Sequence, residues 1–490
     1  MFKGALAANF IVNIAASPIA SLNKDLRPLL SQNAAIWYPG SEGFSNATNR
    51  WSADTSPGID VVVSVAAEKD VQATIKYANA HSLPFLAING GHGTSSYLNN
   101  VKSGIGIHMR GLKGVSLSAL NSSQAVILGG TLSREVIAGL ESFKKQSTTG
   151  GCDCTGFTAP MLGGGHGWLQ GRYGLMTDNL VSARVVLANG TAISVDATQH
   201  SDLYWGLRGA GHNFGIVTSV NYQVYDTTPD TDGFATATFT FTQDKLEAVF
   251  AIANSWLAAK NRPTELTHYG IFTNNAAVDP NPLIVFLVYW QGPGPIPAQY
   301  TDPLRALKPV STANAHVDLL GANANTGASL DGPACAHGNG RQTFPVDLDS
   351  WDLGNLRSVL NIFAGFSSSA LKDSVMLLEG FATNRVLEID PASTAYASRG
   401  SQLLASPLLT YPPGNATLDS EVAAVGKRIR ATLLNGSEGG RLRAYVNYAN
   451  GDESQESVYG YEEWRLQRLR ALKRAYDPEG RFNFYEPIKV

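Results

Sequence analysis

The sequence predicts an α+β protein, and three features of its 490 residues carry that prediction. Apolar segments at 60–65 and 83–88 flank residues 68–81, whose apolar positions have helical spacing, and this order is typical of a parallel βαβ unit. From 234 to 241, threonine alternates with apolar residues, as in an antiparallel strand with one exposed face. A last amphipathic helix at 461–476 ends at an Asp-Pro pair, which stops a helix.

Periodicity and turn residues predict the remaining elements. In chain order these are a helix at 132–145, strands at 181–188 and 191–195 joined by the hairpin signal Asn189-Gly190, a strand at 216–224, a helix at 245–260, strands at 267–273 and 282–290, a helix at 419–434 and a strand at 442–448. Residues 292–350 are rich in Gly, Pro, Ala and Asn, so we expect them to be mostly loop. The composition changes at 226–233, which we interpret as a domain boundary.

The composition is that of a large protein with little net charge. It holds 37 Lys+Arg against 40 Asp+Glu, and 44% of its residues are hydrophobic, enough for a sizeable core. A nucleic-acid-binding protein would carry a basic excess, and a membrane span needs an apolar run of about 18 residues. The longest apolar run, Pro282–Trp290, has only the length of a strand. We therefore expect neither nucleic acid nor membrane as a partner.

Residues 1–21 resemble a secretory signal peptide, with Lys3 followed by small apolar residues and then Ser17-Pro18-Ile19-Ala20. The alternative is an ordinary N-terminal segment, because Asn9 and Asn13 interrupt the apolar region. Asn-x-Ser/Thr sequons agree with secretion and occur at Asn46, Asn121, Asn189, Asn415 and Asn435. We expect a secreted, extracellular glycoprotein.

Glycine makes up 49 residues, and three of its clusters lie beside predicted strands, at 89–95, 149–167 and 208–215. Backbone N–H groups can cradle an anion only where no side chain crowds them, so such loops need glycine. Three clusters together indicate one extended phosphorylated cofactor, and the alternative is a set of separate tight turns. The clusters contain neither Gly-x-Gly-x-x-Gly nor a P-loop, so the cofactor is not held in either of those two ways.

The three cysteines are too few for a disulfide framework. Cys152 and Cys154 are separated by one residue, and a metal or redox pair is one interpretation of that spacing. No second cysteine pair lies nearby to complete a metal site, so we expect no metal. Cys335 is most simply an unpaired cysteine in a loop or in the core.

Seven motifs follow one another along the chain. They are Asn89-Gly-Gly-His92, Gly151-Cys152, Leu162-Gly-Gly-Gly-His-Gly167, Tyr173-Gly-Leu-Met-Thr-Asp-Asn179, Gly209-Ala-Gly-His-Asn-Phe-Gly-Ile-Val-Thr218, Tyr445-Val-Asn-Tyr448 and Tyr476-Asp-Pro478. In this order they resemble the berberine bridge enzyme-like oxidases of the vanillyl-alcohol oxidase flavoprotein superfamily, in its fungal secreted branch. The resemblance implies a PCMH-type FAD-binding domain in two parts, 55–228 and 430–490. An inserted substrate domain of antiparallel sheet and helices would fill 229–429.

The resemblance also implies the cofactor, FAD, and the residues that bind it. His92 would be bonded to the flavin 8α-methyl group, and Cys152, eleven residues before Gly163, to flavin C6. Two alternatives are that Cys154 forms the second bond, or that the flavin is attached through His92 alone. The other expected FAD contacts are Asn89, Gly90, Gly91, Gly93, Thr94, Gly151, Gly156, Gly163, Gly164, Gly165, His166, Gly211, Asn213, Gly215, Ile216, Val217 and Asn447.

In the resembled family the second tyrosine of the Tyr-x-Asn-Tyr segment is the base that takes the substrate's hydroxyl proton, which here implies Tyr448. A tyrosine can do so if nearby charge lowers its pKa. Strand alternation would place Tyr448 with Val446 and away from Tyr445. Glu379 interrupts an apolar strand and is a second catalytic candidate, although an acidic residue on a half-exposed sheet usually faces water.

On the substrate side the chain departs from the plant relatives. Ala395–Arg399 stands where they carry a Phe-Pro-His-Arg run, and Ile88 replaces an arginine before the Gly-Gly-His loop. Aromatic residues that could line an open carbohydrate groove are Trp256, Tyr289, Trp290 and Trp351, and His268 is a further candidate near the flavin. The basic residues of the last helix, Arg465, Arg468, Arg470, Lys473 and Arg474, are expected on a solvated face.

The implied function is a secreted, FAD-dependent oxidase with covalently attached flavin. It would move a hydride from a substrate carbon to flavin N5 and pass the electrons to O₂, giving H₂O₂. The substrate is a carbohydrate-type alcohol or a secondary metabolite. The alternatives are a flavin dehydrogenase with another acceptor and a flavoprotein kept for binding with little turnover. Beyond a small-molecule substrate and O₂ we expect no partner, and we expect a monomer.

Overall fold

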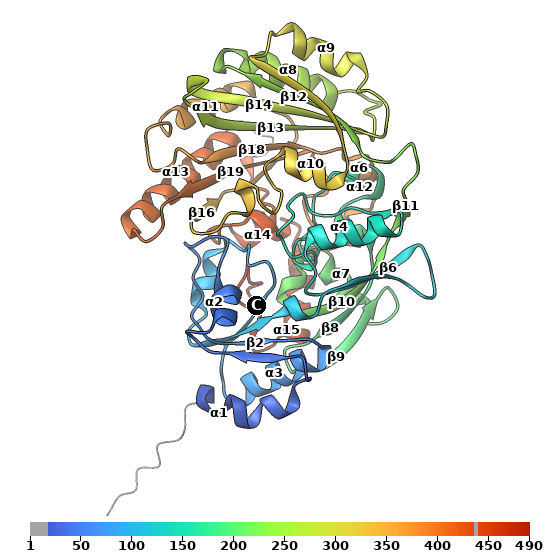
Figure 1. Cartoon of the computed structure of the whole chain (residues 1–490), viewed down its shortest axis with the longest axis vertical. Helices are drawn as coiled ribbons and strands as arrows, with labels where there is room; N and C mark the ends of the chain where they lie inside the picture. Colours follow the sequence, from blue (N-terminus) through green and yellow to red (C-terminus); the bar gives the residue numbers. More distant parts are fainter. Residues whose placement is uncertain (1–17, 436–439) are drawn as a thin grey trace, which may run out of the picture.

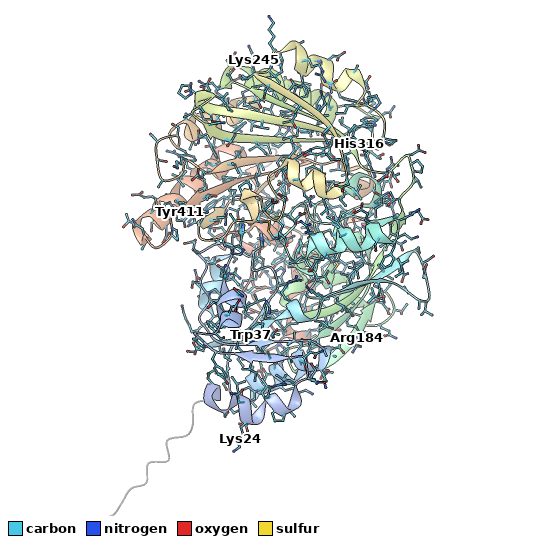
Figure 2. The ribbon with its side chains drawn as sticks, viewed as in Figure 1. Lys24, Trp37, Arg184, Lys245, His316 and Tyr411 are labelled. Carbon is cyan, nitrogen blue, oxygen red and sulfur yellow. A yellow bond between two sulfur atoms is a disulfide. The ribbon has the colours of Figure 1, made fainter. Side chains whose placement is uncertain are left out.

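The computed structural model describes residues 18–435 and 440–490. The expected signal peptide lies outside these residues except for its last four, which begin helix α1 (Pro18–Asp25). Helices and sheets both contribute, so the α+β prediction is confirmed. Within the described ranges, no helix has the length and apolarity that crossing a bilayer requires. Figure 2 shows Lys24 and Lys245 projecting from opposite ends of the molecule.

The first sheet confirms the predicted parallel unit near the N-terminus. Its strands lie in the order β1 (Ala35–Trp37), β2 (Ile59–Ser64), β4 (Gly104–His108) and β3 (Phe85–Ile88). Strands β2 and β3 both run parallel to β4, which lies between them, and helix α3 (Glu68–Ala80) connects them. The loop that follows β3 carries His92, so this sheet fixes where that loop starts.

The second sheet is antiparallel. Its order is β5 (Val115–Leu117), β6 (Gln124–Leu128), β10 (Ile216–Gln223), β8 (Leu180–Val186) and β9 (Ala192–Asp196). Strands β8 and β9 form the predicted hairpin, with Gly190 at φ +78° in its turn. Helix α15 (Glu463–Tyr476) returns from the C-terminal end of the chain and packs against α7 (Ser201–Ala210) in the lower part of the molecule (Figure 1).

An eight-stranded antiparallel sheet forms the upper part (Figure 1). Its order is β15 (Ser311–Val317), β12 (Phe234–Phe241), β14 (Asp279–Gln291), β13 (Leu266–Asn275), β18 (Val375–Gly380), β19 (Leu403–Tyr411) and β16 (Gly340–Thr343), and β17 (Val346–Leu348) also pairs with β19. Other described elements are α2 (Glu42–Thr48), α4 (Ser133–Ser142), β7 (Lys145–Gln146), α5 (Thr158–Leu162), α6 (Gln170–Tyr173), β11 (Tyr225–Asp226), α10 (Leu319–Asn325), α12 (Asn384–Glu388) and α14 (Gln455–Tyr459).

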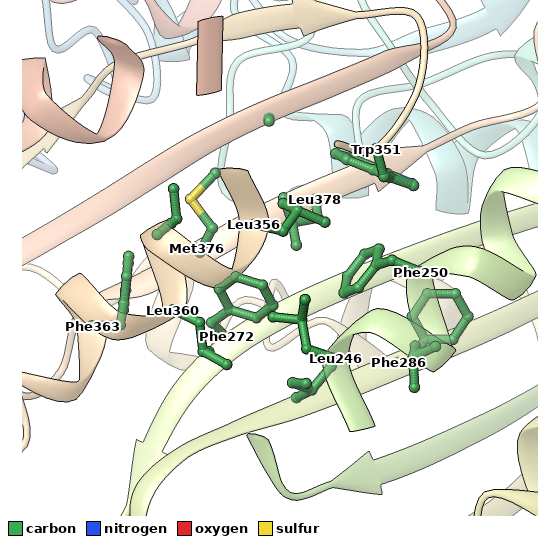
Figure 3. Packing of buried hydrophobic residues seen from close by; sticks show 14 of the residues in the cluster. Leu246, Phe250, Phe272, Phe286, Trp351, Leu356, Leu360, Phe363, Met376 and Leu378 are labelled. Carbon is green, nitrogen blue, oxygen red and sulfur yellow. The ribbon is translucent and has the colours of Figure 1, made fainter. Parts of the chain in front are cut away.

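One face of the large sheet is covered by helices α8 (Leu246–Leu257), α11 (Leu353–Ala364) and α13 (Ala416–Leu434). Figure 3 shows the core between them, where Phe250 of α8 meets Phe272 of β13 and Phe286 of β14 with ring centroids 6.0 and 5.8 Å apart. Because side chains alternate along a strand, the residues next to these point to the other face. That other face carries the candidate active site.

Two predictions of local structure are wrong. Residues 292–350 are not mostly loop, because they form α9 (Ala298–Ala306), α10 and three strands. Their edge strand β15 is exposed along nearly its whole length and pairs with β12 through the backbone, so it shows no apolar alternation. Residues 442–448 are not a strand either. Ala444 N donates to Ser457 O, and Arg443 O accepts from Asp347 N, so each neighbouring segment contributes one hydrogen bond and no strand ladder forms. Residues Val446–Tyr448 form a 3₁₀ turn, η10.

The prediction that the basic residues of the last helix lie on a solvated face is wrong for two of them. Arg465 and Lys473 are each 1% exposed. Arg465 donates to the carbonyl groups of Thr394 and Pro391, and Lys473 pairs with Asp477 at 2.6 Å. Both side chains therefore hold α15 against the rest of the protein.

Candidate active site

The loop after β3 packs His92 between an aromatic ring and the cysteine cluster, with cationic side chains nearby. Its Nε2 lies 3.1 Å from Cys154 Sγ, and the indole of Trp51 stacks on its ring with centroids 4.9 Å apart. Desolvation, together with the charges of His337, Arg50 and Arg341, lowers the pKa of His92 to about 3. The imidazole is therefore neutral at physiological pH, which is the state that can bond to an electrophilic carbon.

The cysteines are arranged differently from the expectation. Cys154 and Cys335 form a disulfide across 181 residues of sequence, so Cys335 is not unpaired and Cys154 is not free to attach a flavin. Cys152 is the free thiol, 3.6 Å from Cys154 Sγ, and burial raises its pKa. Sequence spacing could not show this pairing, because Cys335 lies 181 residues further along the chain, in the turn η7 (Pro333–Cys335), and only the fold brings it to the loop.

The two expected flavin-linking atoms are close together. The donor atoms of His92 and Cys152 lie within 4.8 Å of each other. The 8α-methyl group and C6 belong to the same flavin ring, so two bonds to one flavin require this proximity. Cys154 belongs to the same cluster, but its sulfur is committed to the disulfide and is not a thiolate ligand.

Buried polar atoms beside the glycine loops also fit a polar ligand. Asn89 Oδ1, Ser133 Oγ and Thr149 Oγ1 are buried, with no hydrogen-bond partner among the described residues. Such groups are costly unless a ligand or water satisfies them. At Gly151 a Cβ would meet nothing closer than 3.7 Å, so this loop leaves the backbone accessible. The residues present fit FAD.

Other glycines in the expected set serve the packing of protein against protein. A Cβ at Gly163 would lie 2.3 Å from Asn447 Oδ1, and one at Gly164 would lie 2.7 Å from the Tyr396 ring. Asn447 itself donates to Pro160 O at 2.9 Å and to Tyr445 Oη at 2.7 Å. Two more glycines are packed in the same way. A Cβ at Gly90 would lie 2.5 Å from the Cys154 carbonyl oxygen, and one at Gly156 would lie 2.6 Å from the Asn89 side chain.

The remaining expected contacts hold the loops to other parts of the chain. Thr94 Oγ1 bonds to Thr343 Oγ1, and Gly91 adopts φ +69°. His166 bonds to Tyr396 Oη at 3.0 Å and to Gln170 Oε1 at 2.9 Å. Asn213 donates to Tyr459 and accepts from the backbone of Ile488, so it lies where the C-terminal segment returns. A Cβ at Gly211 would meet Leu162 and one at Gly215 would meet Val185, each at 2.5 Å, and Ile216 and Val217 begin β10.

Tyr448 and Glu379 meet at the face of the large sheet opposite helices α8, α11 and α13. Tyr448 Oη donates to Glu379 Oε1 at 3.0 Å, and Tyr269 Oη donates to the same oxygen at 3.1 Å. Glu379 is 3% exposed, so the alternative that it faces water is wrong. Burial raises the pKa of Glu379 to about 7, and the charge of Asp347 adds to the rise against the two tyrosine hydrogen bonds.

The expectation that nearby charge lowers the Tyr448 pKa is wrong. Burial and the negative charge of Glu379 instead raise the Tyr448 pKa well above its ordinary value. The tyrosine is therefore a neutral phenol that can accept a proton only while passing its own to Glu379. Strand alternation does not separate Tyr445 from Tyr448, since the 3₁₀ turn brings their rings to 5.2 Å.

The aromatic residues divide between the two faces of the large sheet. Trp168, Tyr269, Tyr289 and Phe381 form one cluster on the face of Glu379. Trp256, Trp290 and Trp351 belong to the helix-covered core on the opposite face, where Trp351 Nε1 donates to His268 Nε2 at 3.0 Å. The prediction that these three tryptophans and His268 lie at the site is therefore wrong, because alternation turns them away.

Sequence reasoning missed the residues that surround His92. Arg50 donates to the Gly93 carbonyl at 2.5 Å. The loop therefore has a guanidinium group beside it, although position 88, where relatives carry an arginine, is an isoleucine. The Arg341 guanidinium lies 4.7 Å above the Trp51 ring. No local pattern marks these residues, because Arg50 and Trp51 precede the first motif and Arg341 comes from β16.

Comparisons with known proteins agree with this geometry. The family model described as "FAD binding domain" matches residues 59–196, and the one described as "Berberine and berberine like" matches 444–489. The FAD-linked oxidoreductase chyH of Penicillium rubens is 38% identical over 95% of this chain and 93% of its own length. The FAD-linked oxidoreductase chry5 of Gibberella zeae is 37% identical over 98% of each chain.

Solved structures share the fold at low identity. BBE-like 1 of Physcomitrella patens superposes with a TM-score of 0.81 at 20% identity, covering 96% of this chain and 99% of that one. The glucooligosaccharide oxidase of Acremonium strictum, described with a 6-S-cysteinyl, 8α-N1-histidyl FAD, gives 0.80 at 18% identity, covering 96% and 100%. The fold prediction is thereby confirmed as that of the PCMH-type flavoproteins. Because a relative that is 38% identical matches 95% of its length, the chain belongs to the berberine bridge enzyme-like family of FAD-dependent oxidoreductases.

Proposed function

We propose that this protein is an oxidase that carries FAD bonded to His92 and Cys152 and oxidises an alcohol of a small metabolite. The observation that carries the proposal is the position of the Tyr448–Glu379 pair beside the flavin-linking residues. A negative charge on Cys152 would raise the pKa of Tyr448, so the two residues lie within electrostatic range of each other. Thr343 joins the two regions, since it bonds to both Thr94 and the Tyr448 carbonyl.

Bound FAD would supply the acceptor for a hydride from the substrate carbon. The chain supplies the proton acceptor. Tyr448 takes the hydroxyl proton as it gives its own to Glu379 Oε1, 3.0 Å away. Tyr269 holds the same oxygen at 3.1 Å, so the carboxylate stays oriented toward the phenol. Glu379 must be ionised at the start, and with its pKa at about 7 it is ionised in half of the molecules at neutral pH.

Attachment through two residues is supported by the proximity of the His92 and Cys152 donor atoms and by the free thiol of Cys152. The test is to denature the purified protein and to ask whether the yellow colour stays with the chain in the wild type, His92→Ala, Cys152→Ala and the double variant. We expect each single variant to retain flavin through the other residue and the double variant to lose it. Retention in the double variant would show that both assignments are wrong.

A metabolite alcohol is favoured over an oligosaccharide by the aromatic residues. Three of the four residues proposed for a carbohydrate groove pack into the opposite core, and Tyr289 is fully buried. The carbohydrate-type alcohol is the second candidate, because solved structures with the same fold include a xylooligosaccharide oxidase with xylobiose. Flavin bleaching under anaerobic conditions with a panel of both substrate classes separates the two.

Oxygen as acceptor, secretion and the monomeric state belong to the same proposal. A disulfide such as Cys154–Cys335 is typical of proteins from oxidising compartments, which supports secretion. Mixing the reduced protein with O₂ and measuring H₂O₂ tests the acceptor. Slow reoxidation by O₂ with fast reoxidation by a quinone or dye indicates a dehydrogenase, and failure of every substrate class to reduce the flavin indicates a binding role.

A further inference from the structure

A second buried carboxyl group lies on the same face of the large sheet as Glu379. Strand β19 pairs with β18 on one side and β17 on the other, and Leu404 of β19 is the direct partner of both Glu379 and Asp347. Residues directly opposite in antiparallel strands share a face. The two carboxyl groups therefore flank Leu404, with their Cα atoms two strand spacings apart, about 10 Å.

A small cavity connects the two groups. Its volume is about 10 Å³, and its lining includes both Asp347 and Glu379 together with His166, Tyr396, Ser398 and Ser401. This volume is at the lower limit for one water molecule, which needs several polar partners. The cavity has room for a water molecule and not for a substrate.

Asp347 has bonding capacity left over. The residue is 5% exposed, and its Oδ2 is buried with no hydrogen-bond partner among the described residues. Ser401 Oγ, on the same cavity, is unpartnered in the same sense. Burial raises the pKa of Asp347 to about 7 despite the hydrogen bond from Ser398 and the charge of Arg443, and the charge of Asp349 adds to the rise. Two acids of matched pKa exchange a proton with little energy difference between donor and acceptor.

We propose that Asp347 and one water molecule in this cavity form the route by which protons pass between Glu379 and the solvent. The proposal deepens the function proposed above, in which Glu379 receives the substrate's proton through Tyr448. Each step moves one proton and no electrons: from Tyr448 to Glu379, from Glu379 to the water, and from the water to Asp347 as the water's own proton leaves. Asp349, two residues along the chain and 46% exposed in its side chain, marks where the route reaches the surface.

Other titratable groups around the cavity do not replace Asp347 in this role. Burial lowers the pKa of His166 to about 4, so it is neutral at working pH and already bonded to Gln170 and Tyr396. Burial raises the pKa values of Tyr396 and Tyr445, which stay neutral. Arg399 is paired with Asp178 at 2.7 Å, and Arg443 with Asp349 at 2.8 Å.

The first test needs no substrate. At pH 5.5 both carboxyl groups carry protons, and after mixing into D₂O the infrared C=O band of protonated Glu379 shifts as the proton exchanges; Glu379→Gln assigns the band. We expect Asp347→Asn to slow this exchange by about 100-fold, the lower end of what a positioned acid or base supplies. Asp373→Asn, which removes an exposed carboxyl group just before β18, is the matched control and exchanges as the wild type does. Unchanged exchange in a folded Asp347→Asn protein would overturn the proposal.

A second variant guards against a general structural effect. Asp347→Glu keeps a carboxyl group on the cavity, and we expect its exchange rate to lie within a few-fold of the wild type, whereas Asp347→Asn with the same unfolding temperature stays slow. Slow exchange in both would indicate that the packing of β17, and not the acid, sets the rate, which contradicts the proposal.

A third measurement separates this inference from the proposed function. During anaerobic flavin reduction, a pH indicator in the medium should report proton release in step with the flavin in the wild type and a delay in Asp347→Asn. If no alcohol reduces the flavin while exchange still depends on Asp347, then the oxidase proposal fails and the proton route stands. If the flavin is reduced and proton release keeps pace in Asp347→Asn, then the route is wrong and the oxidase proposal is unaffected.

Discussion

Tyr448 donates a hydrogen bond to Glu379 across 3.0 Å, although the two residues lie 69 positions apart and on different types of structure. Glu379 belongs to strand β18, and Tyr448 to the 3₁₀ turn η10 of the C-terminal segment. The shared hydrogen bond joins the inserted sheet to the returning C-terminal segment, and in the proposed function it makes one proton-transfer unit of both. Its chemistry depends on the ionisation of the carboxyl group, since the phenol is held neutral.

The first prediction concerns pH. The Glu379 pKa, raised to about 7, means that the carboxylate needed as proton acceptor is protonated below this pH and ionised above it. We expect the rate of flavin reduction by a substrate to rise about tenfold per pH unit below 7 and to level off above, as for any single ionisation. Stopped-flow absorbance across pH 5–9 measures this.

Two variants control that profile. Glu379→Gln should lose the acidic limb along with most of the rate, about 100-fold or more. Tyr448→Phe should lower the rate in the same way while leaving a carboxyl group that still titrates in the infrared. An acidic limb that persists in Glu379→Gln would assign the ionisation to another group.

The second prediction concerns the disulfide. Cys335→Ser removes the bond that ties residue 154 to residue 335. A native disulfide typically contributes about 2–4 kcal/mol, so we expect the unfolding temperature to fall by several degrees. Peptide mapping should find Cys154 alkylated without prior reduction only in the variant. The exposed neighbour Ala336→Ser is the control and should leave the unfolding temperature unchanged.

The third prediction concerns the close packing of Gly163. A Cβ there would lie 2.3 Å from Asn447 Oδ1, so Gly163→Ala should displace Asn447 from Pro160 and Tyr445. We expect a loss of about 1–3 kcal/mol of stability, as for overpacking in a core. The double variant Gly163→Ala/Asn447→Ala should recover only part of it, since the clash with Asn447 is removed while Val446 Cγ1 still lies 2.6 Å from the added Cβ. Gly400→Ala, with no atom within 4 Å of the added Cβ, is the control.

The fourth prediction concerns the buried ion pair of α15. Lys473 and Asp477 are 1% and 0% exposed in their side chains and 2.6 Å apart. Lys473→Met leaves the carboxylate buried without its cation, which typically costs about 3–5 kcal/mol. Lys473→Met/Asp477→Asn should cost less than the single variant, and the exposed Arg474→Met should cost almost nothing. Equal losses in the single and double variants would show that the pair is not what holds the helix.

Much of the secondary structure was predictable, because it depends on local periodicity and turn chemistry. Strand β12 was predicted at its observed bounds, and the β8–β9 hairpin from Asn189-Gly190. The sequence failed where local propensity and tertiary packing disagree. Residues 442–448 have the composition of a strand, yet they contact two separate segments and turn at Tyr448 instead of pairing.

By itself the sequence determined that an extended phosphorylated cofactor is expected, since glycine loops are local features, and the resemblance of its motifs to a known family implied FAD and the residues that bind it. Only the tertiary structure decided which cysteine is free, which aromatics face the Tyr448–Glu379 pair, and that Tyr448 is a neutral phenol hydrogen-bonded to a buried glutamate. Those outcomes depend on register and burial. The pairing of β17 and β18 with β19 places Asp347 beside Glu379, and desolvation then sets the pKa of both carboxyl groups at about 7.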